Sequence, residues 1–137
     1  WGGEDLAADL GASSNRDAGG RYHTPFRLAR DAMLFAAKAA GVAAIDADFT
    51  DVRDADGLAA EGAEAEAVGF TGKLAIHPAQ IGPIHGAFTP GPAQVDWARR
   101  VLAAMDAAGD GVATLDGQML DRPHRRQAEA ILARRRG

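Results

Sequence analysis

The stretch GFTGKLAIHPAQI, residues 69–81, carries the clearest strand signal in this sequence. Its centre, residues 73–77, is short and largely apolar, and Pro78 ends it, as is typical of a buried strand in a parallel sheet. A similar apolar run occupies residues 42–46, and a helix over about residues 58–68 is expected between the two. This alternation of strands and helices predicts βα units around a parallel sheet, and therefore an α/β fold.

A long amphipathic helix is expected before these strands. Thr24-Pro25 provides a cap and a first-turn proline, and Gly41 provides a stop. The apolar positions recur at helical spacing and are Phe26, Ala29, Met33, Ala36, Ala37 and Ala40. The polar face is formed by Arg27, Arg30, Asp31 and Lys38. Residues 1–24 are rich in Gly and Ser, so we expect a loop there with at most a short helix near residues 6–10.

The last third of the chain has a different pattern. Thr-Pro-Gly-Pro at residues 89–92 indicates a linker, and an apolar stripe over residues 95–105 predicts a helix that ends at Gly109. Asp116-Gly117 lies between two apolar runs, which predicts a β-hairpin. A final helix is expected from Pro123 onward.

Length and composition exclude several classes of protein. The chain has 137 residues, a formal net charge of −4 and 47% hydrophobic residues, which argues against wholesale disorder and makes one domain the first expectation. It contains no cysteine, which excludes a disulfide scaffold or a cysteine zinc site, and its acidic balance does not suggest a nucleic-acid partner. No apolar run is long enough to cross a bilayer and no export signal is recognisable, so we expect no membrane partner and a cytoplasmic location.

The sequence is expected to be part of a larger fold. It starts at Trp1, without an initiator methionine, in what is expected to be a loop. Two strands alone would also leave large apolar faces of a parallel sheet uncovered, so we expect further strands outside this sequence.

The first candidate site is Gly2-Gly3-Glu4-Asp5 at the start of the chain. A carboxylate beside glycines is able to approach a hard cation such as Mg²⁺, which prefers oxygen ligands. The alternative is that Asp5 caps the short helix that follows, and spacing alone favours this alternative.

Further candidates follow the two expected strands. Asp46 opens an acidic loop, residues 46–56, whose spacing does not match an EF-hand calcium site. The acidic side chains of this loop are therefore expected to cap helices or to face solvent, and Asp46 alone, at a strand end, is a candidate for a pocket residue. His77 and Gln80 follow the second strand, on the side that carries active sites in parallel α/β folds. The alternative for His77 is a hydrogen-bonding role at the rim, and spacing does not decide between the two.

Two weaker candidates lie elsewhere. Asp121 follows the expected hairpin, and spacing favours a role as the N-cap of the last helix. Residues 16–21, Arg-Asp-Ala-Gly-Gly-Arg, are able to cradle a phosphate, but they lack both the GxGxxG and the Walker spacing, so a flexible loop is favoured.

Several ordered blocks together resemble one known family. The blocks are GGEDLAADLG, AGVAAIDADFTDVRDADGL, GFTGKLAIHPAQI and DGQMLDRPH. Their order and spacing, from residue 1 to about residue 133, are similar to those in the C-terminal half of the citrate lyase β-subunit-like CoA-ester lyases of the HpcH/HpaI aldolase superfamily. The GKL and IHPAQI segments together are specific, whereas GGED alone is not.

The resemblance implies a TIM (β/α)8 barrel with a C-terminal extension. By this comparison residues 1–88 supply the last strands and helices of the barrel. Residues 89–137 form a helical and hairpin extension, a lid expected to pack on a neighbouring subunit of a homotrimer or a multiple of it. Because such barrels need about 250 residues, the earlier strands are expected upstream of this sequence.

The resemblance also implies site residues. Family members hold Mg²⁺ with a Glu and an Asp: the Asp matches Asp5, whereas the Glu and a substrate-binding Arg are expected upstream. Asp121 matches an acid/base Asp that in several members reaches into the adjacent subunit's site. The residues expected at the rim of the substrate or CoA pocket are Glu4, Asp46, His77 and Gln80.

The function that the resemblance implies is a Mg²⁺-dependent lyase for the C–C bond of 3-hydroxyacyl-CoA esters of the malyl, citramalyl or citryl type. The products are an oxo acid and an acyl-CoA, with coenzyme A entering as part of the substrate. Mg²⁺ would clamp the oxo acid, and a carboxylate would move the proton at the thioester carbon. Two alternatives stay open: an aldolase of the same superfamily that uses free oxo acids, and a noncatalytic half-barrel fragment or partner subunit.

Overall fold

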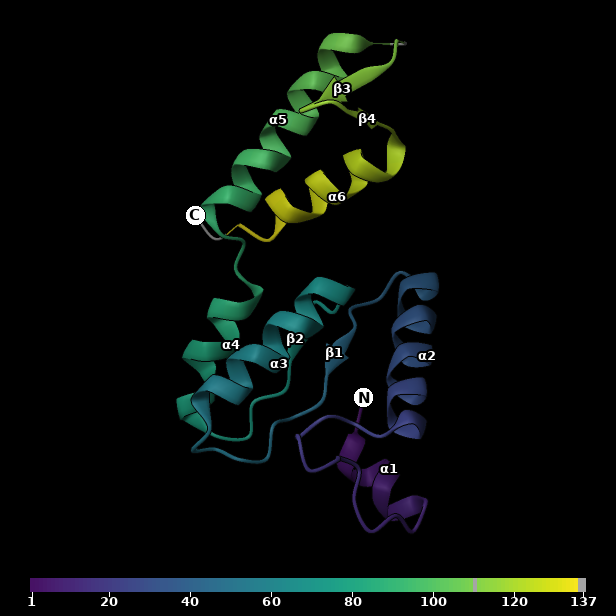
Figure 1. Cartoon of the computed structure of the whole chain (residues 1–137), viewed down its shortest axis with the longest axis vertical. Helices are drawn as coiled ribbons and strands as arrows, with labels where there is room; N and C mark the ends of the chain where they lie inside the picture. The colour runs from purple at the N-terminus through teal and green to yellow at the C-terminus, as the bar shows by residue number, and fades with distance from the viewer. Residues whose placement is uncertain (110, 136–137) are drawn as a thin grey trace. The chain divides into compact units, whose positions relative to one another are not determined.

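The computed structural model describes residues 1–109 and 111–135. The chain forms two compact units, Trp1–Phe88 and Thr89–Gly137 (Figure 1). Within the described residues, no helix has both the length and the apolar character needed to cross a lipid bilayer.

The first unit alternates helices with short strands. Its elements are α1 (Gly3–Asp9), α2 (Thr24–Ala40), β1 (Ile45–Asp46), α3 (Ala55–Val68), β2 (Gly72–Lys73), the 3₁₀ helix η1 (Pro78–Gln80) and α4 (Ile81–Phe88). β1 and β2 pair in parallel, with Ile45 opposite Gly72 and Asp46 opposite Lys73. The expected βα order and the parallel pairing are therefore present in this unit.

Both strands are shorter than the sequence predicts. The apolar runs at residues 42–46 and 73–77 predict five residues each, whereas each paired strand has two. The reason is that pairing defines a strand, and among the described residues β1 and β2 have only each other as neighbour. Backbone hydrogen bonds extend the ladder by one step at each end, from Thr71 N–H to Ala44 O (2.8 Å) and from Leu74 N–H to Asp46 O (3.1 Å).

The termini of α2 follow the local sequence signals. Pro25 lies in the first turn, and Gly41 ends the helix in the left-handed conformation with φ 69°. The cap position is His23 rather than the expected Thr24. The buried core that α2 shares with α3 and with the residues just before β1 and just after α3 consists of Leu34, Ala37, Ala44, Ala65 and Phe70.

Helix α4 was not apparent in the sequence. Two prolines, Pro78 and Pro83, indicate a break in this region, but Pro83 lies in the first turn of α4, where a backbone N–H has no intrahelical acceptor. α4 packs closely on α3, because a Cβ atom built on Gly62 would lie 2.9 Å from the Cβ of Ala87. Gly62 therefore sets the distance between these two helices.

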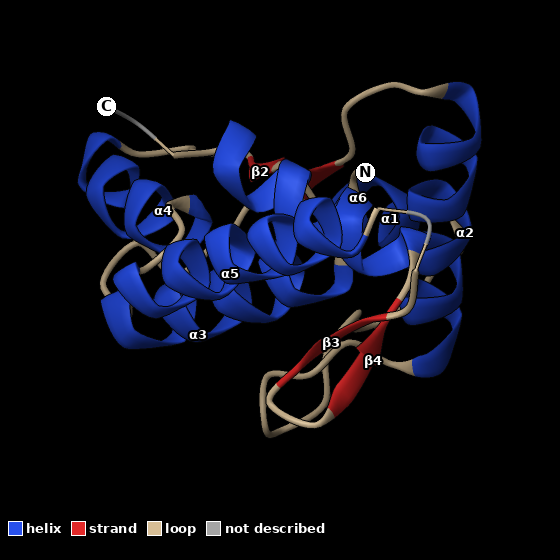
Figure 2. Ribbon diagram, turned by 90° about the horizontal axis from the view of Figure 1, so that it is seen from above, coloured by secondary structure: helices blue, strands red, loops and turns tan. Residues whose placement is uncertain are grey.

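The second unit is a helix, a hairpin and a helix. Its elements are α5 (Pro92–Ala108), β3 (Ala113–Leu115), β4 (Gln118–Leu120) and α6 (Arg122–Ala133), and the strands are drawn red in Figure 2. The predicted hairpin is present: β3 and β4 are antiparallel, and Asp116 (φ 51°) and Gly117 (φ 80°) form the turn. The core of this unit consists of Ala98, Val101, Ala113, Leu120, Ala128 and Ile131.

Candidate functional site

Asp5 lies in the first turn of α1, and its carboxylate is unpartnered. The cap position of the helix is Gly2, so Asp5 does not take the capping role that spacing favoured. Among the described residues its carboxylate has no hydrogen-bond or ion-pair partner. Its Oδ2 would lie 3.0 Å from a Cβ atom built on Gly2, so the glycine leaves room for this carboxylate at the helix N-terminus.

The donor set for a metal at this position is limited. Glu4 is exposed, and its Oε1 accepts a hydrogen bond from Asn15 Nδ2 at 2.7 Å. In the part of the chain that the structure describes, no three His, Cys, Asp or Glu side chains come together as a metal site. The free oxygen donors of Asp5 fit Mg²⁺ in kind, since Mg²⁺ is usually bound through one or two carboxylates with water and substrate oxygens. This chain therefore offers one clear ligand and not a complete cage.

Asp46 is completely buried at the end of β1 and is held by positive groups. Its Oδ1 accepts hydrogen bonds from Arg30 Nε (2.9 Å) and Trp1 Nε1 (2.8 Å). Its Oδ2 accepts from Arg30 Nη2 (3.1 Å) and Lys73 Nζ (3.3 Å). Burial raises the pKa of Asp46, but the hydrogen bond from Arg30 and the charge of Lys73 outweigh it and lower that pKa below its ordinary value. The carboxylate thus stays ionised inside a closed set of partners.

The ion pairs continue from Asp46 into a network of six charged groups. Lys73 Nζ also contacts Glu61 Oε1 at 2.6 Å, and Glu61 in turn pairs with Arg16 at 2.5 Å. Arg30 also pairs with Glu64 at 2.8 Å. Three positive and three negative groups balance one another, and the Lys73 side chain is fully buried. This network joins the loop before α2, α2 itself, both strands and α3.

The burial of Arg30 corrects the sequence analysis. Arg30 was assigned to the polar face of α2, but it is 6% exposed. It lies on the same helical face as the buried residues Phe26, Leu34 and Ala37, which are four, four and seven residues away from it. The spacing was therefore available in the sequence, whereas its acidic partners, which lie far along the chain, were not.

His77 and Gln80 have different surroundings. His77 is exposed and caps η1, with its Nδ1 accepting from Ala79 N–H at 3.2 Å. Gln80 is 1% exposed and bridges two loops: its Oε1 accepts from Ile76 N–H (2.9 Å), and its Nε2 donates to Phe49 O (2.7 Å). Gln80 thus fixes the chain after each strand, and only His77 has a side chain open to a ligand.

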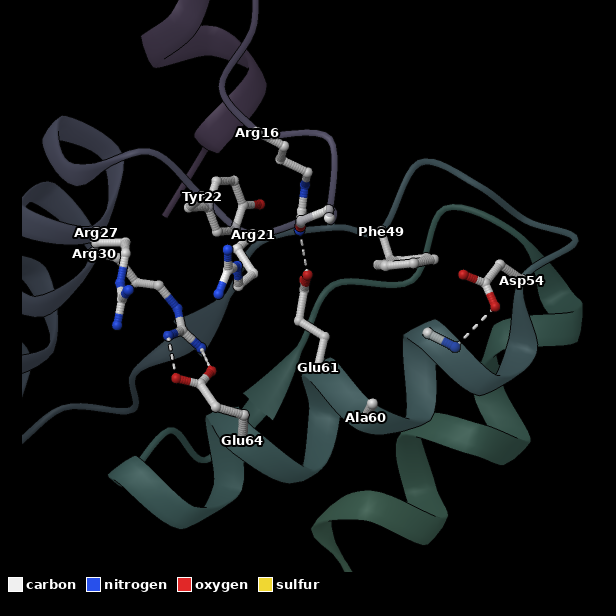
Figure 3. Close-up of a pocket in the computed structure, with 13 residues that line it drawn as sticks. Arg16, Arg21, Tyr22, Arg27, Arg30, Phe49, Asp54, Ala60, Glu61 and Glu64 are labelled. Carbon is white, nitrogen blue, oxygen red and sulfur yellow. Dashed lines mark hydrogen bonds and ion pairs between the residues drawn. The ribbon is translucent and has the colours of Figure 1, made fainter.

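A pocket of about 450 Å³ lies between the loop before α2, α2 and α3. Figure 3 shows Arg16 reaching from the loop toward Glu61 on α3, with Arg30 and Glu64 paired nearby. The pocket does not include Glu4, Asp5, Asp46, His77, Gln80 or Asp121, but Arg16, Gly19, Gly20 and Arg21 of the weaker candidate at residues 16–21 line it. The charged residues that α2 and α3 add to the pocket were not predicted, because they lie in segments separate from residues 16–21.

The phosphate cradle considered for residues 16–21 is already filled by the chain itself. Asp17 Oδ1 accepts hydrogen bonds from the backbone N–H groups of Gly19 (2.8 Å) and Arg21 (3.0 Å), and Asp17 O accepts from Gly20 N–H (2.9 Å). The backbone hydrogen bond from Arg21 is the main reason why the pKa of Asp17 lies below its ordinary value. The backbone amides of this loop are therefore not free to bind an anion.

Asp121 is in the second unit, at the N-cap position of α6. Its Oδ1 lies 2.5 Å from His124 Nδ1, and its own N–H donates to the same nitrogen at 3.2 Å. Both side chains are partly exposed, and among the described residues each forms an ion pair only with the other. The cap position is as the spacing predicted, and the carboxylate is accessible.

Known proteins similar to this chain are lyases and related proteins. A citrate lyase subunit beta-like protein of Mycobacterium tuberculosis is 44% identical over 98% of this chain and 49% of that protein. The mitochondrial citramalyl-CoA lyase of Rattus norvegicus is 42% identical over 96% of this chain and 38% of that protein. The chain thus spans about half, or less, of the length of these relatives.

The fold is also similar to a solved structure. The crystal structure of CitE from Mycobacterium tuberculosis in complex with magnesium, acetoacetate and coenzyme A matches with a TM-score of 0.88 and 44% identity, over 98% of this chain and 50% of that one. This match confirms the α/β class. That the full-length protein forms a complete barrel, and that this chain is its C-terminal half, stay predictions.

The sequence profile of one family covers more than half of the chain. The profile described as HpcH/HpaI aldolase/citrate lyase matches residues 1–78, which contain Asp5, Asp46 and His77. The match confirms the resemblance seen in the ordered sequence blocks. This chain belongs to the HpcH/HpaI aldolase/citrate lyase family.

Proposed function

We propose that this chain is part of a Mg²⁺-dependent lyase for the C–C bond of 3-hydroxyacyl-CoA esters. Its similarity to a citramalyl-CoA lyase and to a structure that contains magnesium, acetoacetate and coenzyme A supports this class of reaction. The substrates would be thioesters of the malyl, citramalyl or citryl type, and the products an oxo acid and an acyl-CoA. Overall, one proton moves from the substrate hydroxyl to the carbon next to the thioester as the C–C bond breaks.

The free carboxylate of Asp5 is the observation that carries this proposal. It is exposed, unpartnered among the described residues and next to Gly2, whose lack of a side chain leaves room for it. Asp5 would therefore be one ligand of Mg²⁺, with further oxygen ligands from outside this chain. Bound there, Mg²⁺ would orient and polarise the oxo acid. Glu4, tied to Asn15, would support the first turn of α1 and not bind the ion.

Asp121 would be the acid/base group. Its carboxylate is accessible at the start of α6, where it would give a proton to the thioester α-carbon in cleavage and remove it in condensation. The second unit would act as a lid that brings Asp121 to the site of a neighbouring copy in a trimeric assembly. Its contact with His124 would hold the carboxylate in a defined position.

The remaining candidates would frame the substrate pocket. By the family resemblance, β1 and β2 would be among the last strands of a TIM barrel, and their parallel register supports a common end of the sheet for the residues that follow them. His77 has an open side chain at this end and is the candidate for a contact with the thioester. Asp46 and Gln80 are fully buried, so they would support the pocket wall from behind.

An assay of the full-length protein tests this function. Malyl-CoA and citramalyl-CoA would be supplied with Mg²⁺ or with EDTA, and both the oxo acid and the acyl-CoA product would be measured. We expect stoichiometric formation of the two products that depends on Mg²⁺. Activity with pyruvate and an aldehyde but not with a thioester would instead indicate a CoA-independent aldolase, and no turnover of either kind would favour a noncatalytic partner subunit.

A further inference from the structure

The pocket between the residue 16–22 loop, α2 and α3 has the size and lining of a ligand site. Its volume of about 450 Å³ falls within the range of small-molecule sites, about 300–1,000 Å³. Its walls combine the aromatic rings of Tyr22 and Phe49 with several arginine side chains (Figure 3). Such a lining suits a molecule that has both an apolar part and an anionic part.

Arg16 is held in place at this pocket with free donors. Its Nη1 donates to Glu61 Oε2 (2.5 Å) and to Gly20 O (2.8 Å), and its guanidinium carbon lies 3.8 Å from the centre of the Tyr22 ring. The Nε–H and both Nη2–H groups have no partner among the described residues, and these atoms are not fully buried. A fixed planar guanidinium with three free N–H groups matches the geometry of phosphate oxygens.

Arg27 supplies a second free cation. Its guanidinium has no hydrogen-bond or ion-pair partner among the described residues. In Figure 3 the Tyr22 ring lies between Arg27 and Arg16. The charged groups that line the pocket are Arg16, Arg21, Arg27, Arg30, Asp54, Glu61 and Glu64. Arg16, Arg21 and Arg30 are each paired with a carboxylate, so among the described lining residues Arg27 is the arginine that lacks an anionic partner, and a bound anion would supply one.

We propose that this pocket binds a phosphate-bearing small molecule. Arg16 and Arg27 hold the phosphate oxygens, and the rings of Tyr22 and Phe49 contact the organic part of the ligand. The backbone of the loop takes no part, because Asp17 already accepts its N–H groups. This site shares no residue with the proposed lyase site, so the proposal does not depend on the lyase activity.

Equilibrium dialysis of labelled inorganic phosphate against the full-length protein tests the site. We expect saturable binding with one phosphate per subunit. Arg27→Gln removes a charged hydrogen-bond donor and is expected to weaken binding on the order of tenfold. Arg16→Lys keeps the charge but removes the planar fork, and a loss of the same order is expected. The matched control is Arg53→Gln, which removes the same charge from a side chain that is 91% exposed and outside the pocket, and it should leave binding unchanged.

Three results would overturn the proposal. They are the absence of saturable binding, an equal loss in the Arg53→Gln control, and displacement of phosphate by acetate as effectively as by unlabelled phosphate. Displacement by adenosine monophosphate at a lower concentration than by inorganic phosphate would support the organic part of the ligand. Arg27 is exposed on α2 and has no hydrogen-bond or ion-pair partner among the described residues, so we expect Arg27→Gln to fold. The binding measurement on Arg27→Gln therefore tests the site even if Arg16→Lys does not fold.

Discussion

Replacing Lys73 by methionine tests whether the buried ion-pair network stabilises the first unit. The Lys73 side chain is fully buried, and its Nζ lies 2.6 Å from Glu61 Oε1 and 3.3 Å from Asp46 Oδ2. Methionine fills a similar volume but leaves both carboxylates without this cation. Removing one partner of a buried ion pair costs about 3–5 kcal/mol. Because Asp46 keeps Arg30 and Glu61 keeps Arg16, we expect the lower end, about 3 kcal/mol.

The sequence contains a matched control, since Lys38 is the only other lysine. Lys38 is exposed in the last turn of α2, so Lys38→Met loses a favourable interaction with the helix dipole of about 0.3–1 kcal/mol. The assay is urea unfolding of the full-length protein, followed by circular dichroism at one fixed protomer concentration. With a slope of about 2 kcal/mol per molar, a loss of 3 kcal/mol lowers the midpoint by about 1.5 M.

The comparison of the two lysine variants decides the outcome. A midpoint for Lys73→Met that equals the midpoint for Lys38→Met would refute the reasoning, because burial and pairing would then contribute nothing. A Lys73→Met variant more stable than the wild type would show that the cost of desolvating the network exceeds its Coulomb attraction.

Three further predictions concern acid stability, the hairpin and the assembly. The folded-state pKa of Asp46 is lowered, so its stabilising contribution is complete above about pH 4 and is lost as the pH falls through the folded pKa. The unfolding free energy should therefore fall less steeply with decreasing pH in Asp46→Asn than in the wild type, and equal slopes would count against this role of Asp46. Gly117 has φ 80°, so Gly117→Ala should lower the unfolding free energy by about 1 kcal/mol in urea titrations, and an unchanged midpoint would contradict the turn geometry. Mixing inactive Asp5→Asn and Asp121→Asn subunits should restore part of the thioester cleavage, whereas no recovery would argue that Asp121 does not act across subunits.

Elements that depend on local signals were predictable from the sequence. The hairpin follows from Asp116-Gly117, because both turn residues adopt positive φ, which this residue pair tolerates best. The ends of α2 follow from Pro25 and Gly41 for similar local reasons. The parallel pairing of β1 and β2 follows from the strand–helix–strand order, although the length of each strand depends on its neighbours and was overestimated.

Features that depend on distant partners were not predictable. Arg30 is buried because Asp46 and Glu64, sixteen and thirty-four residues away in sequence, neutralise it, so its polarity alone gave the wrong face. Gln80 was expected at the rim of a pocket, but its amide bonds to backbone groups of two loops that only the fold brings together. The complete pocket beside Arg16 could not be assembled from the sequence for the same reason, since its lining comes from the loop before α2, α2, the loop after β1, and α3.

The most direct test of the central claim is the Mg²⁺ affinity of Asp5→Asn, measured by calorimetry in the full-length protein. The matched control is Asp9→Asn, which changes an exposed carboxylate at the end of the same helix. We predict that wild type and Asp9→Asn bind Mg²⁺ with equal affinity, whereas Asp5→Asn binds it at least about tenfold more weakly, a difference of about 1.4 kcal/mol. Equal affinity in all three proteins would contradict the assignment of Asp5 as a magnesium ligand.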